Sequence, residues 1–146
     1  MRASAGRLRC GPAFLTGFAA VVLASGCSNV SSEERLCRTS VSATLLNPET
    51  AEFHDFKQMS PSEFERAASQ MAMDARAVSA GQDLVEQNRA SFEAVGREMA
   101  QGLSAKGASF YSLRVRADGR LGNKVTALQL CAASKGECSC LGPESF

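Results

Sequence analysis

The sequence predicts an α+β fold: a long or kinked amphipathic helix and an N-terminal helix pack on a small antiparallel sheet, and disulfides cross-link the domain. Three observations support this fold class. Apolar residues recur with a helical period between residues 61 and 105, and apolar and polar residues alternate between residues 110 and 117. Four cysteines lie near the two ends of the expected domain, one before these segments and three after them. A helical region followed by strands is typical of helices packed on an antiparallel sheet.

The first 26 residues have the composition of an export signal. Arg2, Arg7 and Arg9 give a basic start without acidic residues, and a mainly apolar run follows from Ala13 to Ala24. As a helix this run would be ~18 Å long, too short to cross a hydrocarbon core of ~30 Å. A basic start, a short apolar centre and small residues at the end are typical of a secretory signal peptide.

The segment Leu23-Ala24-Ser25-Gly26-Cys27 resembles the lipobox of bacterial lipoproteins. It departs from the family pattern at Ala24, where leucine is preferred and alanine is tolerated. The resemblance implies that a diacylglycerol group alkylates the Cys27 thiol and that the preceding signal peptide is removed. Two or three acyl chains anchor a protein stably without a transmembrane helix. The alternative is an ordinary secretory signal with an incidental cysteine.

The residue after the cysteine is Ser28 rather than aspartate, which in Gram-negative lipoproteins implies sorting to the outer membrane. We expect residues 1–26 to be the signal peptide, 27–32 a lipid-anchored tether, 33–142 a single small domain and 143–146 a tail. The signal peptide carries three of the sixteen basic residues and none of the fifteen acidic ones, so the mature chain has a net charge of −2. This balance argues against a nucleic-acid partner.

A first helix is expected to begin after Ser31 or Ser32 and to end at Asn47-Pro48, because the residue before proline avoids the α region. The segment from Ala51 to Met59 is predicted to be a short edge strand. The helix would bury apolar residues that recur at helical spacing: Leu36, Cys37, Val41 and Leu45.

The longest helical pattern begins with a capping box, Ser60-Pro61-Ser62-Glu63. We interpret the apolar stripe behind it as a helix face that packs on a sheet or on another helix, with a self-associating coiled coil and a membrane-surface helix as alternatives. The stripe repeats every seven residues: Phe64, Met71, Val78, Val85, Phe92 and Met99.

A continuous helix over residues 61–105 would be ~67 Å long, which exceeds the size of a compact domain of this length. Gly81 is a candidate stop, and it favours two helices or a kinked one. The unbroken seven-residue phase across Gly81 favours a continuous helix, so the sequence leaves both arrangements open.

Two strands are predicted after the helical region. Phe110 to Ala117 alternates, with Leu113 and Val115 on one side of the strand and arginines on the other. Asp118-Gly119 is a hairpin-turn signal, although Gly122-Asn123 would widen the turn, and a second strand covers Lys124 to Ala132. A further turn at Ser134-Lys135-Gly136 would bring Cys138 back beside Cys131.

Four thiols remain after Cys10 leaves with the signal peptide and Cys27 takes lipid. An even number in an exported domain favours two disulfides and no metal or cofactor. A Cys138–Cys140 bond would be strained, because only one residue separates these two cysteines in an extended segment. Cys131 is therefore expected to pair with Cys138 or Cys140, and Cys37 with the other. The alternative use of Cys37, Cys131, Cys138 and Cys140 is soft-metal binding or thiol redox chemistry.

No catalytic motif is evident, and the single histidine, His54, has no recognisable catalytic partners. Basic residues gather around the predicted hairpin and would meet an acidic partner or anionic lipid headgroups, or else protect a strand from edge-to-edge pairing: Arg114, Arg116, Arg120 and Lys124. We therefore expect a non-enzymatic, outer-membrane-anchored periplasmic lipoprotein that acts as an accessory, assembly or protein-binding module for an unknown envelope protein.

Overall fold

The computed structural model describes residues 30–143. The predicted signal peptide, the predicted lipidation site Cys27 and the start of the predicted tether lie outside the described residues, as do residues 144–146 of the predicted tail. Residues 33–142, the predicted domain, lie entirely within the described part.

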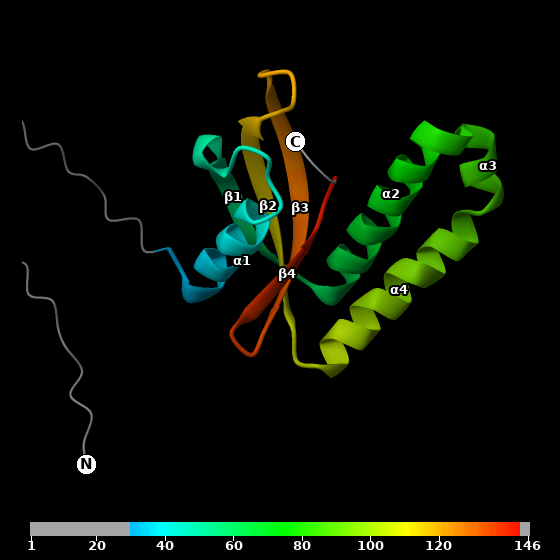
Figure 1. Cartoon of the computed structure of the whole chain (residues 1–146). Coiled ribbons are helices and arrows are strands. Elements are labelled where there is room, and N and C mark those ends of the chain that lie inside the picture. The colour runs from blue at the N-terminus through cyan, green and yellow to red at the C-terminus, as the bar shows by residue number, and fades with distance from the viewer. Residues whose placement is uncertain (1–29, 144–146) are drawn as a thin grey trace, which may run out of the picture.

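The centre of the fold is one antiparallel sheet with the strand order β1-β2-β3-β4 (Figure 1). Consecutive strands are neighbours, so β1 and β4 form its two edges. The sheet and the helices that pack on it confirm the predicted α+β class and the predicted edge strand near residues 51–59. The strands are β1 (Glu52–Met59), β2 (Ser109–Asp118), β3 (Lys124–Ser134) and β4 (Glu137–Leu141).

The alternation predicted for β2 is present. Leu113 and Val115 are fully buried on one face, whereas Arg114 and Arg116 are exposed on the other. The turn that follows is wider than an Asp118-Gly119 hairpin, because Asp118 already pairs with Lys124 and residues 119–123 form the loop. The N–H of Gly119 donates to the carbonyl of Asn123 at 2.9 Å and closes this loop.

Helix α1 (Ser32–Ser42) covers one face of the sheet. The hydroxyl of Ser31 caps it by accepting the N–H of Glu34 at 3.1 Å, as predicted for this serine. Cys37 and Val41 are buried against Leu113 and its neighbours on the sheet. The first core of the domain therefore lies between α1 and the sheet.

The predicted end of the first helix at Asn47-Pro48 is wrong. The helix ends at Ser42, where both the N–H and the hydroxyl of Thr44 bond to the carbonyl of Val41, at 2.9 and 2.8 Å. Pro48 instead begins a 3₁₀ turn, η1 (Pro48–Thr50), because its fixed φ suits a first helical position.

A helical hairpin forms the other layer, with α2 and α4 side by side (Figure 1). Gly81 has φ +87, in the left-handed region that favours glycine, and the chain reverses there. The region therefore forms separate helices, as the stop at Gly81 predicts, and not one continuous helix. Its members are α2 (Pro61–Ala80), α3 (Gln82–Gln87) and α4 (Arg89–Ala105).

The seven-residue stripe is consequently not one helix face. Phe64 and Val85 are buried, but Val78, between them, is 91% exposed, close to the reversal at Gly81. Three helices share the stripe, since the chain folds back in its middle. The chain therefore does not form a coiled-coil seam along one helix from Phe64 to Met99.

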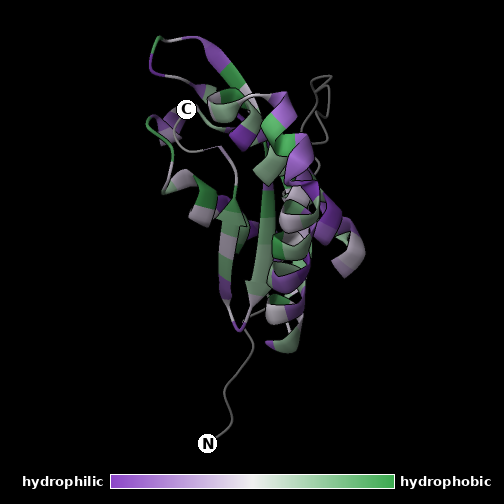
Figure 2. Ribbon diagram, turned by 90° about the vertical axis from the view of Figure 1, so that its right-hand side faces the viewer, coloured by the Kyte–Doolittle hydropathy of each residue, from purple (hydrophilic) through white to green (hydrophobic). Residues whose placement is uncertain are grey.

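The hairpin packs on the face of the sheet opposite α1. The rings of Phe64 on α2 and Phe110 on β2 lie 4.5 Å apart between centroids, in a second core with Leu130 and Ala132. Hydrophilic and hydrophobic residues alternate along these helices (Figure 2). The sheet therefore separates two cores, one under α1 and one under the α2–α4 hairpin.

We predict opposite effects of alanine at two glycines of α4. A β-carbon at Gly96 would lie 2.7 Å from the carbonyl oxygen of Glu65 and closer still to the hydroxyl of Ser69, so Gly96→Ala should lower the free energy of unfolding by about 1–3 kcal/mol. Gly102 has no such neighbour within 4 Å, so Gly102→Ala should raise the free energy of unfolding by about 0.5–1 kcal/mol. Urea unfolding of both variants measures the difference; equal effects would contradict the close α2–α4 contact.

The capping box at the start of α2 should make stability depend on pH. The N–H of Ser60 donates to Glu63 at 2.7 Å, and this bond, together with the Ser60 hydroxyl, lowers the pKa of the Glu63 carboxyl from its ordinary value of about 4.5. A lowered pKa stabilises the fold above the ordinary value, and this contribution is lost as the pH falls through the lowered pKa. Urea unfolding between pH 3 and 6 should therefore show that Glu63→Gln loses less unfolding free energy than the unsubstituted protein as the pH falls. Equal losses in the two proteins would refute this.

Candidate functional site

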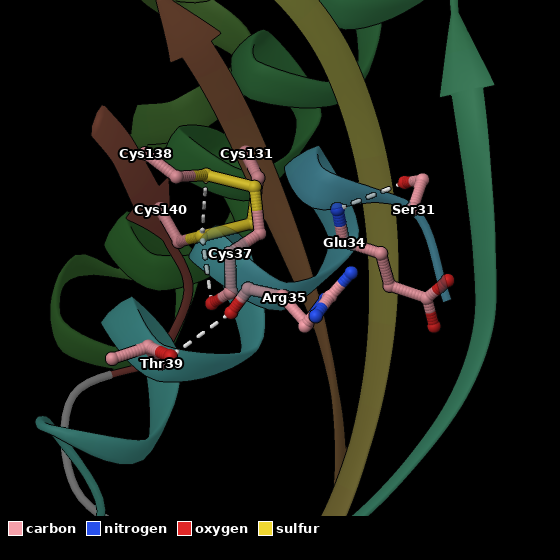
Figure 3. Close-up of a disulfide and its surroundings, with 8 residues drawn as sticks. All are labelled: Ser31, Glu34, Arg35, Cys37, Thr39, Cys131, Cys138 and Cys140. Carbon is pink, nitrogen blue, oxygen red and sulfur yellow. Dashed lines mark hydrogen bonds between the residues drawn. A yellow bond between two sulfur atoms is a disulfide. The ribbon is translucent and has the colours of Figure 1, made fainter. Parts of the chain in front are cut away.

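The four predicted cysteines form a disulfide cluster that joins α1, β3 and β4 (Figure 3). Cys37 on α1 bonds to Cys138, across a sequence separation of 101 residues. Cys131 bonds to Cys140, across a separation of 9. Cys37 and Cys131 are fully inaccessible to solvent, so the cluster is part of the core beneath α1.

The β3–β4 turn determines which cysteines meet. Lys135 and Gly136 both have positive φ, 52° and 82°, which is typical of a two-residue hairpin turn. Ser134 therefore pairs with Glu137, and Cys131 stands opposite Cys140. The expectation that the turn brings Cys138 back beside Cys131 is wrong, because Cys138 pairs with Ala133 in this register and bonds to α1.

Of the two disulfide arrangements that the sequence leaves open, the structure contains Cys37–Cys138 with Cys131–Cys140. The strained Cys138–Cys140 bond is absent, as predicted, although these two sulfur atoms lie only 3.8 Å apart. All four sulfur atoms lie within 4.8 Å of one another. In the disulfide form no thiolate is available, so the cluster can hold a soft metal only after both bonds are reduced.

The predicted basic residues lie around the β2–β3 hairpin, but acidic residues accompany them. Arg114 on β2 pairs with Asp55 on β1 at 3.1 Å, and Lys124 on β3 pairs with Asp118 at 3.1 Å. Glu52 on β1 lies within 4 Å of the side-chain nitrogens of Arg116 and Lys124, at 3.9 and 3.8 Å. Arg120 lies exposed in the loop.

These pairs change the interpretation of the surface. Because β1 covers the outer side of β2, Arg114 and Arg116 lie on an interior strand and do not protect a sheet edge. Because Glu52, Asp55 and Asp118 balance their charge, the surface is mixed in sign. Exposed ion pairs of this kind contribute little to stability. His54, next to them on β1, is half-exposed and 3.7 Å from Glu52.

The structure also contains an apolar groove that sequence reasoning missed, which we call the C-terminal groove. It has a volume of about 410 Å³ and lies between the end of β4 and the α2–α4 hairpin. No charged residue lines it within the described part of the chain. Its walls include Met71 and Ala75 of α2, Val95 and Met99 of α4, Leu141 of β4, and Pro143.

Two polar residues, Thr44 and Gln129 of β3, also line this groove. Gln129 is only 5% exposed and lines the groove. It lies against Gly142, where a β-carbon would overlap the amide. Gly142, the last residue of the predicted domain, and Pro143, the first residue of the predicted tail, both line the groove. The signal that sequence reasoning passed over is a glutamine at an inward position of an otherwise apolar strand face.

Comparison of the chain with protein-family models, with curated proteins and with solved structures finds no match. Among residues 30–143, no helix combines the length and the apolar content that a membrane span requires.

We predict that the two disulfides differ in their contribution to stability. On the chain-entropy model a closed loop of about 100 residues contributes about 4.7 kcal/mol and one of about 10 residues about 2.7 kcal/mol. The pair Cys37→Ser/Cys138→Ser should therefore destabilise the protein by about 2 kcal/mol more than Cys131→Ser/Cys140→Ser. Urea unfolding compares the two double variants directly, because each double variant removes one fully buried and one half-buried sulfur. A larger loss from the Cys131–Cys140 pair would contradict the loop-length argument.

Proposed function

We propose that this protein is a non-enzymatic lipoprotein, anchored through Cys27 to the outer membrane and facing the periplasm, where it acts as an accessory, assembly or protein-binding module. The lipobox resemblance supports the anchor. The observation that carries the binding function is the C-terminal groove, which is apolar and free of charged side chains in the described part of the chain.

The groove has the properties of a site that takes apolar side chains from a partner. Val95 is 51% exposed and Leu141 41%, on opposite walls. Contacts in which an apolar anchor fills such a pocket supply most of the affinity of many protein interfaces. The predicted tether is only five or six residues long, a reach of ~20 Å, so the partner would be met close to the membrane.

A second candidate function is soft-metal binding or thiol redox chemistry at Cys37, Cys131, Cys138 and Cys140. It is favoured by the mutual approach of the four sulfur atoms, all within 4.8 Å. Four thiolates at such distances are suitable ligands for Zn²⁺ or Cu(I). This function requires a thiol reductant that cleaves both disulfides before the metal binds.

The intact mass of membrane-extracted protein, alkylated without reduction, tests the anchor and separates the two candidates. We expect an acylated chain that begins at Cys27 and carries no alkylated thiol. An unlipidated chain would refute the anchor. Four alkylated thiols would instead favour the metal or redox function.

A photo-reactive amino acid at Val95, introduced in intact cells, tests the binding surface. We expect a single protein adduct that is lost with Ala75→Glu, a change that places a charge in the groove, and retained with Ala90→Glu, which is exposed on α4 outside the groove. The matched control places the photo-reactive residue at Leu121, which is 92% exposed in the β2–β3 loop. An adduct from Leu121 and none from Val95 would show that the groove is not the binding surface.

A further inference from the structure

We propose that Phe146 of the chain's own C-terminal segment fills the C-terminal groove and competes there with a binding partner. The contact itself is independent of the proposed function, whereas its regulatory effect rests on the proposed protein-binding function. Residues 144–146 follow the described part of the chain. Three observations carry the proposal: where the chain leaves the described part, how few residues then precede Phe146, and which side chains form the groove.

The chain leaves the described part of the structure at the groove. Its last two described residues, Gly142 and Pro143, both line the groove. Gly142 lies so close to β3 that a β-carbon there would overlap the side-chain amide of Gln129. The ring of Pro143 fixes its own φ and restricts the residue before it to extended conformations. The position and direction of the following residues are therefore restricted to the neighbourhood of the groove.

Phe146 is too near to this point to lie far from the groove. Only Glu144 and Ser145 separate it from Pro143. Three residues span at most ~10 Å. A group on so short a connection has an effective concentration on the order of millimolar at its site. A separate molecule at lower concentration must therefore bind the groove more tightly than Phe146 does in order to replace it.

A chain reversal would bring Phe146 over the groove. Proline is favoured at the second position of common β-turns, which Pro143 occupies in the segment 142–145. The reversed chain would run beside the outer edge of β4, where no other strand of residues 30–143 lies. Phe146 would then stand opposite Leu141, which lines the groove and is 41% exposed. Glu144 would lie at the turn in solvent, so that no charge enters the groove.

The walls of the groove suit an aromatic ring. Met71 of α2 and Met99 of α4 both line it, and a thioether sulfur makes favourable contacts with aromatic rings. Val95 between them in the lining is 51% exposed, which leaves apolar surface for a ring to cover. A buried aromatic side chain removes ~150–250 Å² from water, and this burial offsets the entropy lost by the three ordered residues.

The contact would regulate the groove by competition. A partner's apolar side chain can enter only after Phe146 has left. If Phe146 occupies the groove for about nine-tenths of the time, the apparent affinity for a partner falls about tenfold. The partner site would therefore be covered by the chain itself until a partner of sufficient affinity displaces Phe146.

Methyl NMR of the mature chain carrying Cys27→Ser, labelled at its methionine methyl groups, tests the contact. We expect nuclear Overhauser effects from the ring of Phe146 to the methyl groups of Met71 and Met99. Relative to Phe146→Ala, both methyl signals of the unsubstituted segment should lie upfield, because a ring packed on them shifts their resonances. Ser145→Ala is the matched control and should leave both signals in place.

Two other methionines act as internal controls for folding. Met59 lies on β1, and Met73 lies on a different surface of α2, in a pocket with Glu93. Their signals should be the same with and without Phe146→Ala. Absence of the Overhauser effects, together with equal Met71 and Met99 signals in the two chains, would overturn the proposal.

A mixing experiment excludes a second copy as the source of the ring. Labelled Phe146→Ala chain is mixed with an excess of unlabelled chain that retains Phe146. The signals of Met71 and Met99 in the labelled chain should not change. A return of these signals to the upfield positions would show that Phe146 enters the groove of another copy, which would refute the intramolecular contact.

The photo-adduct from Val95 in cells separates the contact from its regulatory effect and from the proposed function. Phe146→Ala should raise the yield of the adduct severalfold, whereas Ser145→Ala should not change it. An unchanged yield with Phe146→Ala would refute the competition. An adduct without the Overhauser effects would leave the protein-binding function standing and refute the contact. The Overhauser effects without an adduct from either chain would refute the protein-binding function and leave the contact standing.

Discussion

The register set by the turn at Lys135-Gly136 is the constraint on which the rest of the structure depends. It pairs Ser134 with Glu137, so that Cys140 stands opposite Cys131 and Cys138 is left to bond to Cys37 on α1. That bond holds α1 on one face of the sheet. The same register continues to Leu130 and Leu141 and brings Gln129 against Gly142 beside the groove. A slip of one residue would place every side chain of β4 on the other face.

Local signals in the sequence predict much of the fold. The capping box at Ser60, the alternation around Leu113 and the exclusion of a Cys138–Cys140 bond depend on backbone geometry within a few residues, and all are present in the structure. The end of α1 at Ser42 was missed because the bonds of Thr44 to Val41 compete with an apolar pattern that continues to Leu45. Leu45 is buried all the same, but from a loop.

Other features depend on contacts between distant segments, which no local pattern contains. The seven-residue spacing is unbroken across Gly81, yet the chain reverses there, because Phe64 packs on Phe110 and Gly96 allows α4 close to α2. The charge around Arg114 is mixed because β1 lies beside β2 and brings Asp55 to this arginine. The groove forms because the end of β4, the helical hairpin and Gln129 come together in space. Of the candidate site, the sequence therefore predicted the cysteines and the hairpin residues, but neither their register nor the groove.

The Cys37–Cys138 bond also determines how the molecule would carry mechanical load. It joins the sixth residue of α1 to the second residue of β4, the strand that forms one wall of the groove. Tension between the start of α1 and β4 passes through this covalent bond and bypasses the 100 residues between the two cysteines. The helical hairpin, which only packing holds on the sheet, lies within that bypassed loop. A pull along this line would therefore load the covalent bond between α1 and β4 and not the packing of the helical hairpin on the sheet.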